Sequence, residues 1–158
     1  DGLNGRIEAI LDGGPCAVGV ESTILGLTGP AALLRPGGIS VEALESSLGH
    51  ALEMPSTTKI TAPGQLASHY APSAPVRLNI TSPNPNDVYI GFGPSPFPTA
   101  LTLSATGNLI EAAANLFHTL READQIANGS PIAFAPIPDR GLGRAINDRL
   151  TRAAAPRP

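Results

Sequence analysis

The chain has 158 residues, the length of one average domain or of parts of two, and 42% of them are hydrophobic against 15% charged. This composition excludes a disordered, highly charged chain and indicates a globular one. Thirteen acidic residues outnumber nine arginines and one lysine, which gives a net charge of −3. The chain as a whole is therefore not expected to bind nucleic acid through counterion release.

The single cysteine and the lack of a long apolar segment predict the compartment. As the single cysteine, Cys16 cannot form an internal disulfide or build a zinc site, which is consistent with a reducing cytosol. Its simplest role is that of a small buried side chain. No window approaches twenty apolar residues, and no basic-then-apolar signal opens the chain. We expect a cytoplasmic protein with no membrane partner. Because the chain starts at Asp1, we also expect a processed product or a fragment.

Two short strands are predicted in the first third of the chain. Residues 17–27 are rich in β-branched and aliphatic types and lie between glycine–proline turns, which is typical of a strand. A period of two places Val20, Ser22 and Ile24 on one face of that strand. A second apolar run, 31–34, ends at a turn of arginine, proline and glycines.

A short helix and a long linker follow. Ser40 can cap a helix from about Val41 to Leu48, which Gly49 closes. Residues 50–75 then change to prolines, hydroxyl residues and scattered apolar ones with no sustained period. This segment exceeds the usual loop length, which is typical of a functional lid or of a tether between domains.

From residue 76 to the end, strands alternate with helices, which predicts a small, largely parallel α/β domain. Four strands are predicted at 76–80, 88–92, 100–104 and 132–137. Asn108, followed three residues later by Glu111, resembles a capping box and predicts the start of a helix. A last amphipathic helix with arginines on its outer faces has its apolar positions at Leu142, Ile146, Leu150 and Ala153.

Polar residues interrupt the first predicted strand. Glu21, Ser22 and Thr23 lie within an apolar run, where unpaired polar groups cost free energy, so their hydroxyls either satisfy neighbouring backbone groups or bind a ligand. Arg35 stands at a strand end before a Pro-Gly-Gly turn, where a guanidinium can clamp a phosphate while glycines let the backbone approach closely. The alternative for Arg35 is a surface arginine at a turn.

The linker contains one aromatic pair, His69-Tyr70. Its rings can stack on a nucleotide base and its histidine can donate to phosphate; alternatively, Tyr70 anchors the linker in a groove. Gly141-Leu142-Gly143 lacks both the full dinucleotide fingerprint and the lysine of a phosphate-binding loop, so these glycines are expected to shape a turn. No zinc spacing, paired carboxylates or Ser-His-Asp series is present, and no catalytic residue or metal ligand is assigned.

With these residues in view, the chain resembles the L-threonylcarbamoyladenylate synthase family in its long form. That form joins a YrdC-like catalytic domain through a linker to a smaller, Rossmann-like α/β domain. The matching motifs occur in the family's order: Gly-Val-Glu-Ser-Thr at 19–23, Leu-Arg-Pro-Gly at 34–37, Ser-His-Tyr-Ala-Pro at 68–72 and Gly-Leu-Gly-Arg-Ala-Ile-Asn-Asp-Arg-Leu at 141–150. The resemblance implies that residues 1–49 are the carboxy-terminal part of the catalytic domain, 50–75 a linker over the active site, and 76–158 the C-terminal domain.

The resemblance also implies an activity. The family is a nucleotidyltransferase that joins L-threonine, bicarbonate and ATP into threonylcarbamoyl-AMP, releases pyrophosphate and normally uses Mg²⁺. The product passes to the machinery that threonylcarbamoylates tRNA. By position, Ser22 would contact threonine and Arg35 the ATP phosphates, while His69 and Tyr70 would fold over the nucleotide.

One part of the family pattern is missing. The amino-terminal Lys-x-Arg and Ser-x-Asn motifs have no counterpart in this sequence. We therefore interpret the chain as the carboxy-terminal portion of such an enzyme, with an incomplete catalytic domain, and expect the isolated chain to be inactive.

A second hypothesis is a non-catalytic nucleic-acid-binding or regulatory module, which would make a weak tRNA contact. It rests on the arginines near the carboxyl end, namely Arg140, Arg144, Arg149, Arg152 and Arg157. Two acids, Asp139 and Asp148, lie among them, and the usual interleaved aromatic residues are missing. A generic dinucleotide-binding domain is disfavoured because the glycine fingerprint is absent.

Overall fold

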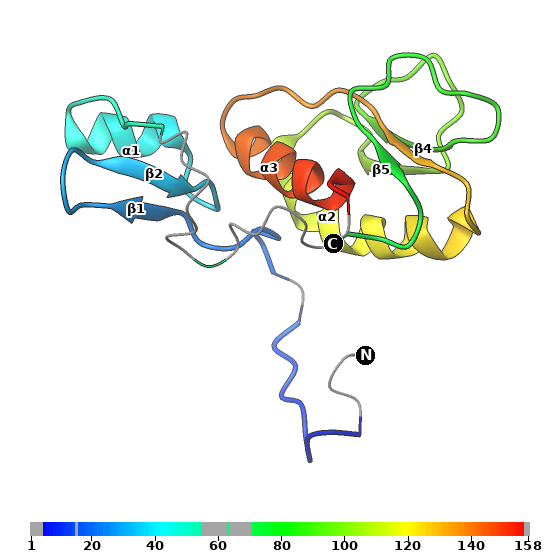
Figure 1. The fold of residues 1–158 in the computed structure, drawn as a ribbon, viewed down its shortest axis with the longest axis horizontal. Helices are drawn as coiled ribbons and strands as arrows, with labels where there is room; N and C mark the ends of the chain where they lie inside the picture. Colours follow the sequence, from blue (N-terminus) through cyan, green and yellow to red (C-terminus); the bar gives the residue numbers. More distant parts are fainter. Residues whose placement is uncertain (1–4, 15, 55–62, 64–70, 157–158) are drawn as a thin grey trace.

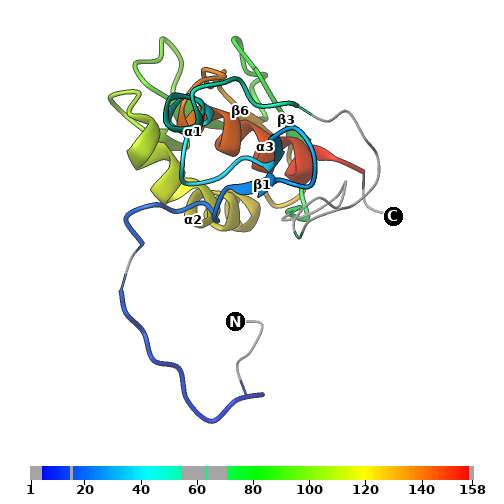
Figure 2. The same ribbon diagram turned by 90° about the vertical axis from the view of Figure 1, so that its left-hand side faces the viewer.

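The computed structural model describes residues 5–14, 16–54, 63 and 71–156, which form two neighbouring units (Figure 1). The small unit, residues 16–54, contains two strands and one helix, and the large unit, residues 71–156, contains a four-stranded sheet and two helices. Residues 5–14 extend away from both units (Figure 2). The predicted α/β class is therefore confirmed.

In the small unit, β1 (Ile24–Gly26) pairs antiparallel with β2 (Ala32–Arg35). β1 is much shorter than the predicted strand 17–27. The reason is that the backbone before β1 bonds to a turn instead of a strand: the Gly38 amide donates to the Glu21 carbonyl at 2.9 Å. The early part of the predicted strand thus faces the turn that follows β2.

Helix α1 (Val41–Leu48) has the predicted bounds. The hydroxyl of Ser40 accepts the Ala43 amide at 3.2 Å, which satisfies one of the unpaired amides of the first turn. Gly49 closes the helix with a φ of 75°, a conformation that glycine adopts without steric cost.

The small unit continues past the predicted boundary at residue 49. The Glu53 carbonyl accepts the Leu33 amide at 2.8 Å, so the chain runs alongside β2 once more. Leu52 is buried with Leu33 and Val41 in a separate hydrophobic cluster. The first residues of the predicted linker therefore belong to the packed small unit.

The large unit is built on four parallel strands in the order β3–β6–β4–β5. Their bounds are β3 (Val76–Arg77), β4 (Val88–Phe92), β5 (Leu101–Ser104) and β6 (Ile132–Phe134). β4 and β5 match the prediction, whereas β3 and β6 are shorter than predicted. β3 ends early because Asn79 adopts a left-handed φ of 57°, and β6 ends before Pro136, which has no amide to donate.

Helices α2 (Leu109–Ala127) and α3 (Leu142–Ala154) pack against the sheet. Ile90, Ile132 and Phe134 point from the strands into a core that both helices share. The opposite face of the sheet carries a smaller cluster, covered by the connections on either side of β4. Within the described ranges, no helix is long and apolar enough to span a bilayer.

Asn108 caps α2 as predicted, but the second half of the capping box is replaced. The side-chain oxygen of Asn108 accepts the amides of Ile110 and Glu111 at 2.8 and 3.1 Å. The Glu111 carboxylate accepts the hydroxyl of buried Ser104 at 2.6 Å, and the Ser104 hydroxyl in turn accepts the Asn108 amide at 2.9 Å. The end of β5 therefore completes the cap of α2.

Two expectations about burial are wrong. Cys16 is exposed, because it lies before the packed part of the small unit. Arg149 does not lie on an outer face of α3: it is only 1% exposed and is the largest fully buried side chain in the described residues. It is buried because the small unit covers this part of α3, with Glu21 as its partner there.

Candidate substrate site around Arg35

The structure brings Ser22 and Arg35 into direct contact. Nε and Nη2 of Arg35 donate to the Ser22 carbonyl at 3.2 and 3.0 Å, and Nη2 also donates to the Ser22 hydroxyl at 3.3 Å. Arg35 is 8% exposed, so the alternative of a surface arginine is wrong. The two residues that sequence analysis assigned to threonine and to phosphate therefore share one location.

Glycine allows the Ser22 segment to approach the turn after β2. A Cβ at Gly37 would lie 2.3 Å from the Glu21 carbonyl oxygen and 2.4 Å from the Ser22 carbonyl carbon, distances that real side chains do not show. Gly38 donates its amide to the same Glu21 carbonyl. Glycine was predicted to let the backbone approach a ligand closely; in the structure it lets the turn approach the Glu21–Ser22 backbone instead.

The Thr23 hydroxyl satisfies neighbouring backbone groups, which is the first of the two roles considered for it. Its hydroxyl donates to the Ile39 carbonyl at 2.7 Å and accepts the Ile39 amide at 3.1 Å, so one side chain replaces a strand partner. Ser22, by contrast, is exposed, and its hydroxyl accepts from Arg35. Of the two hydroxyls, only that of Ser22 is presented both to solvent and to a cation.

The linker reaches this site at Pro63, whose carbonyl accepts Nη1 of Arg35 at 3.1 Å. His69 and Tyr70, assigned to the nucleotide from sequence, lie outside the described residues. The chain is described again from Ala71, beside Leu120 and Asp124 of α2. Pro63 therefore contacts the site, and Ala71 lies beside α2.

Arg149 is a residue of this region that sequence reasoning missed. Its Nε donates to Glu21 Oε2 at 2.7 Å, and its Nη2 donates to the Pro36 carbonyl at 3.1 Å. The missed signal is its spacing: Arg149 lies seven positions after Leu142, which places it on the same face of α3 as the apolar positions.

A second contact between the units joins a side chain of α1 to the start of α3. Glu42 Oε1 accepts the Gly141 amide and Nη2 of Arg144, both at 3.4 Å. The pKa of Glu42 is lowered from its usual 4.5, chiefly by its own backbone amide; desolvation opposes this shift, and Gly141, Arg144 and the Ser40 hydroxyl lower the pKa further by smaller amounts. Charge pairing thus joins the units at two places.

The described residues offer no cage for a metal ion. Across residues 5–14, 16–54, 63 and 71–156, no three His, Cys, Asp or Glu side chains gather closely enough to hold one. Glu21, the carboxylate next to Ser22, is already paired with Arg149.

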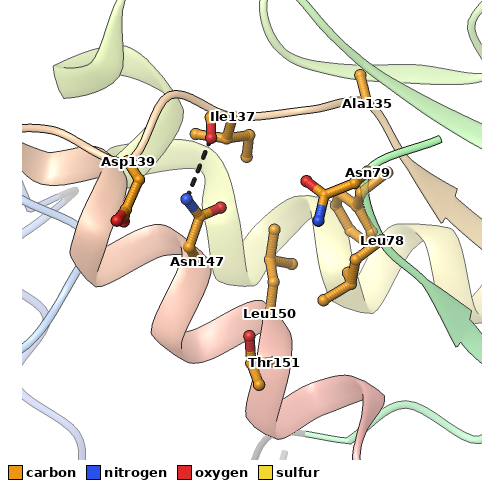
Figure 3. A pocket seen from close by; sticks show the side chains of 9 residues that line it. Leu78, Asn79, Ala135, Ile137, Asp139, Asn147, Leu150 and Thr151 are labelled. Carbon is orange, nitrogen blue, oxygen red and sulfur yellow. Dashed lines mark hydrogen bonds between the residues drawn. The ribbon is translucent and has the colours of Figure 1, made fainter. Parts of the chain in front are cut away.

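A separate hollow of about 300 Å³ lies at the carboxyl ends of β3 and β6 (Figure 3). Asn147 donates to the Ile137 carbonyl at 3.1 Å, and its amide oxygen faces the hollow. Asn79, Asp139 and Thr151 line it and are exposed. No basic side chain is among its nine lining residues, so within the described chain it suits phosphate less well than the Arg35 region does.

The arginines of the nucleic-acid hypothesis are mostly engaged within the protein. Arg144 pairs with Glu42, and Arg149 and Arg152 both contact the Asp148 carboxylate. Arg140 is exposed, and Arg157 lies outside the described residues. The cluster predicted from sequence is therefore a set of ion pairs more than a basic surface.

Comparison with known proteins gives a consistent family. Residues 39–155 match the family model described as threonylcarbamoyl-AMP synthase, C-terminal domain. The threonylcarbamoyl-AMP synthase of Pyrococcus abyssi is 34% identical over 177 residues, which cover 95% of this chain and 50% of the relative. That of Bacillus subtilis is 34% identical over 177 residues, covering 98% and 51%. The chain thus spans about half the length of the curated relatives it matches.

Solved structures agree with this match. The crystal structure of P. abyssi Sua5 complexed with L-threonine superposes with a TM-score of 0.79 at 30% identity, over 96% of this chain and 51% of that one. A variant of P. abyssi Sua5, in which a histidine and the tyrosine after it are replaced by alanine, gives a TM-score of 0.76 at 30% identity, over 96% and 49%. The superposition includes most of the residues before 39, which the family model does not match.

Proposed function

This chain belongs to the threonylcarbamoyl-AMP synthase C-terminal domain family, and from that premise we propose that it forms part of a threonylcarbamoyl-AMP synthase whose site includes Ser22 and Arg35. The enzyme is a nucleotidyltransferase that uses L-threonine, bicarbonate and ATP. Its product, threonylcarbamoyl-AMP, passes to the machinery that modifies tRNA in the cytoplasm.

The observation that carries the proposal is the contact between Arg35 and Ser22. A buried guanidinium stands 3.3 Å from an exposed hydroxyl, so a cation suited to phosphate and a hydroxyl suited to a polar amino acid share one surface. An enzyme that joins an amino acid to a nucleotide must bind the two substrates side by side, so the groups that bind them must lie close together. The complex of P. abyssi Sua5 with L-threonine supports threonine as the amino acid.

The chemistry requires positioning more than a covalent nucleophile. The threonine amine and bicarbonate form a carbamate with loss of water, and a carbamate oxygen attacks the α-phosphorus of ATP. The bond to pyrophosphate breaks, and pyrophosphate leaves. Arg35 stabilises the charge that develops on the phosphate oxygens, while Ser22 orients threonine, so the protein supplies proximity and electrostatic stabilisation. Magnesium bound to ATP would neutralise part of the phosphate charge.

We assign the linker to the nucleotide side of the site. Pro63 of the linker contacts Arg35, the residue assigned to the ATP phosphates. His69 and Tyr70 follow Pro63 in the same linker. The sequence contains one His-Tyr pair, and a His-Tyr pair is the one altered in the P. abyssi variant. In this proposal the small unit, which continues to residue 54, completes the carboxy-terminal part of a YrdC-like catalytic domain, the rest of 50–75 covers its active site, and 76–158 form the C-terminal domain.

The test is pyrophosphate release by the native protein that carries residues 1–158. With ATP and bicarbonate, release should depend on threonine. Arg35→Ala should lower kcat/KM for ATP by about 10²-fold or more, as loss of a group that stabilises transition-state charge does. Ser22→Ala should raise the KM for threonine about tenfold, the value of one hydrogen bond. Arg35→Lys should restore little, because one ammonium cannot reproduce the planar fork.

Arg140→Ala is the matched control, because Arg140 is an exposed arginine in the turn before α3. Circular dichroism of each variant shows whether the fold persists. Threonine-independent release, or full activity of folded Arg35→Ala, would refute the proposal.

A further inference from the structure

Arg149 holds the residues on either side of the substrate pair. Its Nε bonds to the carboxylate of Glu21, which directly precedes Ser22, and its Nη2 bonds to the carbonyl of Pro36, which directly follows Arg35. These partners lie 128 and 113 positions away in the sequence. One side chain from α3 therefore joins both flanks of the site in the small unit.

The bonds of Arg149 are directional. A buried guanidinium is costly unless its donors are paired, so the side chain is stable in this place only when its acceptors are in position. The planar fork sets the angle between the Glu21 and Pro36 contacts, and a lysine could not make both. The neighbouring Asp148 carboxylate contacts Nη1 and completes the pairing.

A second feature anchors the same segment to the large unit. A Cβ at Gly19 would lie 2.2 Å from the Ala113 carbonyl oxygen and 2.5 Å from the Ala114 Cα, so this glycine rests directly on the backbone of α2. Val20 is buried in the core of the large unit. The chain is thus fixed to α2 at 19–20 and to α3 at Glu21 before it reaches Ser22.

We propose that Arg149 is a positioning residue for the Ser22–Arg35 site, through which the large unit sets the geometry of the site in the small unit. Arg149 bonds to the neighbours of the substrate residues and holds the Ser22 hydroxyl and the Arg35 guanidinium face to face. The identity of the substrates rests on the proposed function, whereas the geometric claim does not. The inference gives the large unit an indirect part in substrate binding, through the residues that flank Ser22 and Arg35.

The first measurement follows Arg35 itself in the native protein that carries residues 1–158. The Arg35 Nε–H, bonded to the Ser22 carbonyl, gives an arginine side-chain signal in nitrogen–proton NMR. Replacing Arg149 with methionine should speed the exchange of this proton with water by about tenfold, since the Ser22 segment loses its fixed position. Arg77→Met is the control: it removes another ion-paired arginine of the large unit, whose partner is Asp87, and it should leave the Arg35 signal unchanged.

A second pair of variants works from the small unit, in case Arg149→Met does not fold. Glu21→Gln keeps an acceptor for Arg149 and should keep the Arg35 exchange rate near that of the wild type. Glu21→Ala removes the acceptor and should speed the exchange of the Arg35 proton as Arg149→Met does. The double variant Glu21→Ala/Arg149→Met should be no worse than Arg149→Met alone, because that change has already removed the Glu21 contact.

Kinetics in the native protein that carries residues 1–158 complete the test. Arg149→Met and Glu21→Ala should lower kcat/KM by about 10- to 100-fold, as small misplacements of binding groups do, while Arg77→Met should not. If threonine-dependent release is absent from the wild type, the proposed function fails and the NMR result still decides the positioning claim. If the wild type is active, and folded Arg149→Met or Glu21→Ala keeps both the Arg35 exchange rate and kcat/KM, the positioning claim is wrong.

Discussion

Gly37 and Glu21 touch through their backbones: a Cβ on residue 37 would lie 2.3 Å from the Glu21 carbonyl oxygen. The turn after β2 therefore reaches the Ser22 segment only because residue 37 has no side chain. Arg35 lies at one end of this contact and Ser22 at the other, so the spacing of the substrate pair depends on this glycine.

Gly37→Ala should separate the turn from the Ser22 segment. The added methyl group meets backbone atoms, which cannot rotate away, so we expect a loss of about 1–3 kcal/mol in the free energy of unfolding. The Gly38 to Glu21 hydrogen bond should weaken as well. Urea denaturation of the chain measures the loss, and the Arg35 Nε–H exchange rate reports the local opening.

Gly29→Ala is the control for this change. No atom lies within 4 Å of a Cβ at Gly29, and its φ is not positive. The same addition of a methyl group should therefore change the free energy of unfolding by less than about 0.5 kcal/mol. Equal effects at positions 29 and 37 would show that close approach is not what Gly37 provides.

The sequence was most informative where structure depends on neighbours along the chain. The bounds of α1 were predicted because Ser40 and Gly49 act within one helical turn of its ends. The start of α2 was predicted from Asn108 for the same reason. The strand at 17–27 was overextended, because the length of a strand depends on its partner, and here Glu21 and Thr23 bond to the turn at 38–39 instead.

The substrate site could be predicted only in part, for a related reason. Ser22 and Arg35 were singled out by residue type and by family resemblance, and the structure adds that they touch. Arg149 was assigned to an outer face because its polar type was weighed above its spacing. Its burial depends on Glu21, a residue 128 positions away, which local periodicity cannot reveal.

Acid should weaken the contact between α1 and α3. The pKa of Glu42 is lowered in the folded state, chiefly by its own backbone amide, so its carboxylate contributes stability above pH 4.5. That contribution should disappear as the pH falls through the lowered folded-state value. Because the side chain is half exposed and its ion pair is screened, we expect no more than about 1 kcal/mol.

Urea denaturation of the wild type and of Glu42→Gln between pH 2.5 and 7 measures the contribution of the Glu42 carboxylate to the free energy of unfolding. The difference between the two proteins should be present at pH 6–7 and vanish at the acid end, and 1 M NaCl should reduce it. A difference that persists unchanged to pH 2.5 would mean that the Glu42 charge does not stabilise the contact.

The small unit should lower the solubility and thermal stability of residues 1–158 when they are produced alone. Eight of the ten large hydrophobic residues that are exposed in the described chain precede residue 55, and β1 has a partner on one side only. Unpaired strand edges and apolar surface promote association. We expect residues 1–158 to aggregate or to melt early, whereas residues 76–158, which contain the whole four-stranded sheet, stay soluble.

Thermal melts followed by circular dichroism and light scattering compare the two fragments. Scattering should rise before or during the melt of residues 1–158 and remain low for residues 76–158. A high, reversible melting midpoint of the longer chain without a partner would contradict this prediction.

Weak tRNA binding is the expectation for the carboxyl-terminal arginines. Arg144, Arg149 and Arg152 pair with carboxylates, and the net charge of the chain is −3, so few cations are available to displace counterions. With no more than about two phosphates neutralised, affinity should fall less than about twentyfold between 50 and 200 mM salt. Gel shifts with tRNA at both salt concentrations measure this, and Arg140→Ala, which removes an exposed arginine, should weaken any shift more than Arg149→Met does. A drop of about 10³-fold or more would require several phosphate contacts, and it would favour a nucleic-acid-binding module over a chain whose arginines hold its two units together.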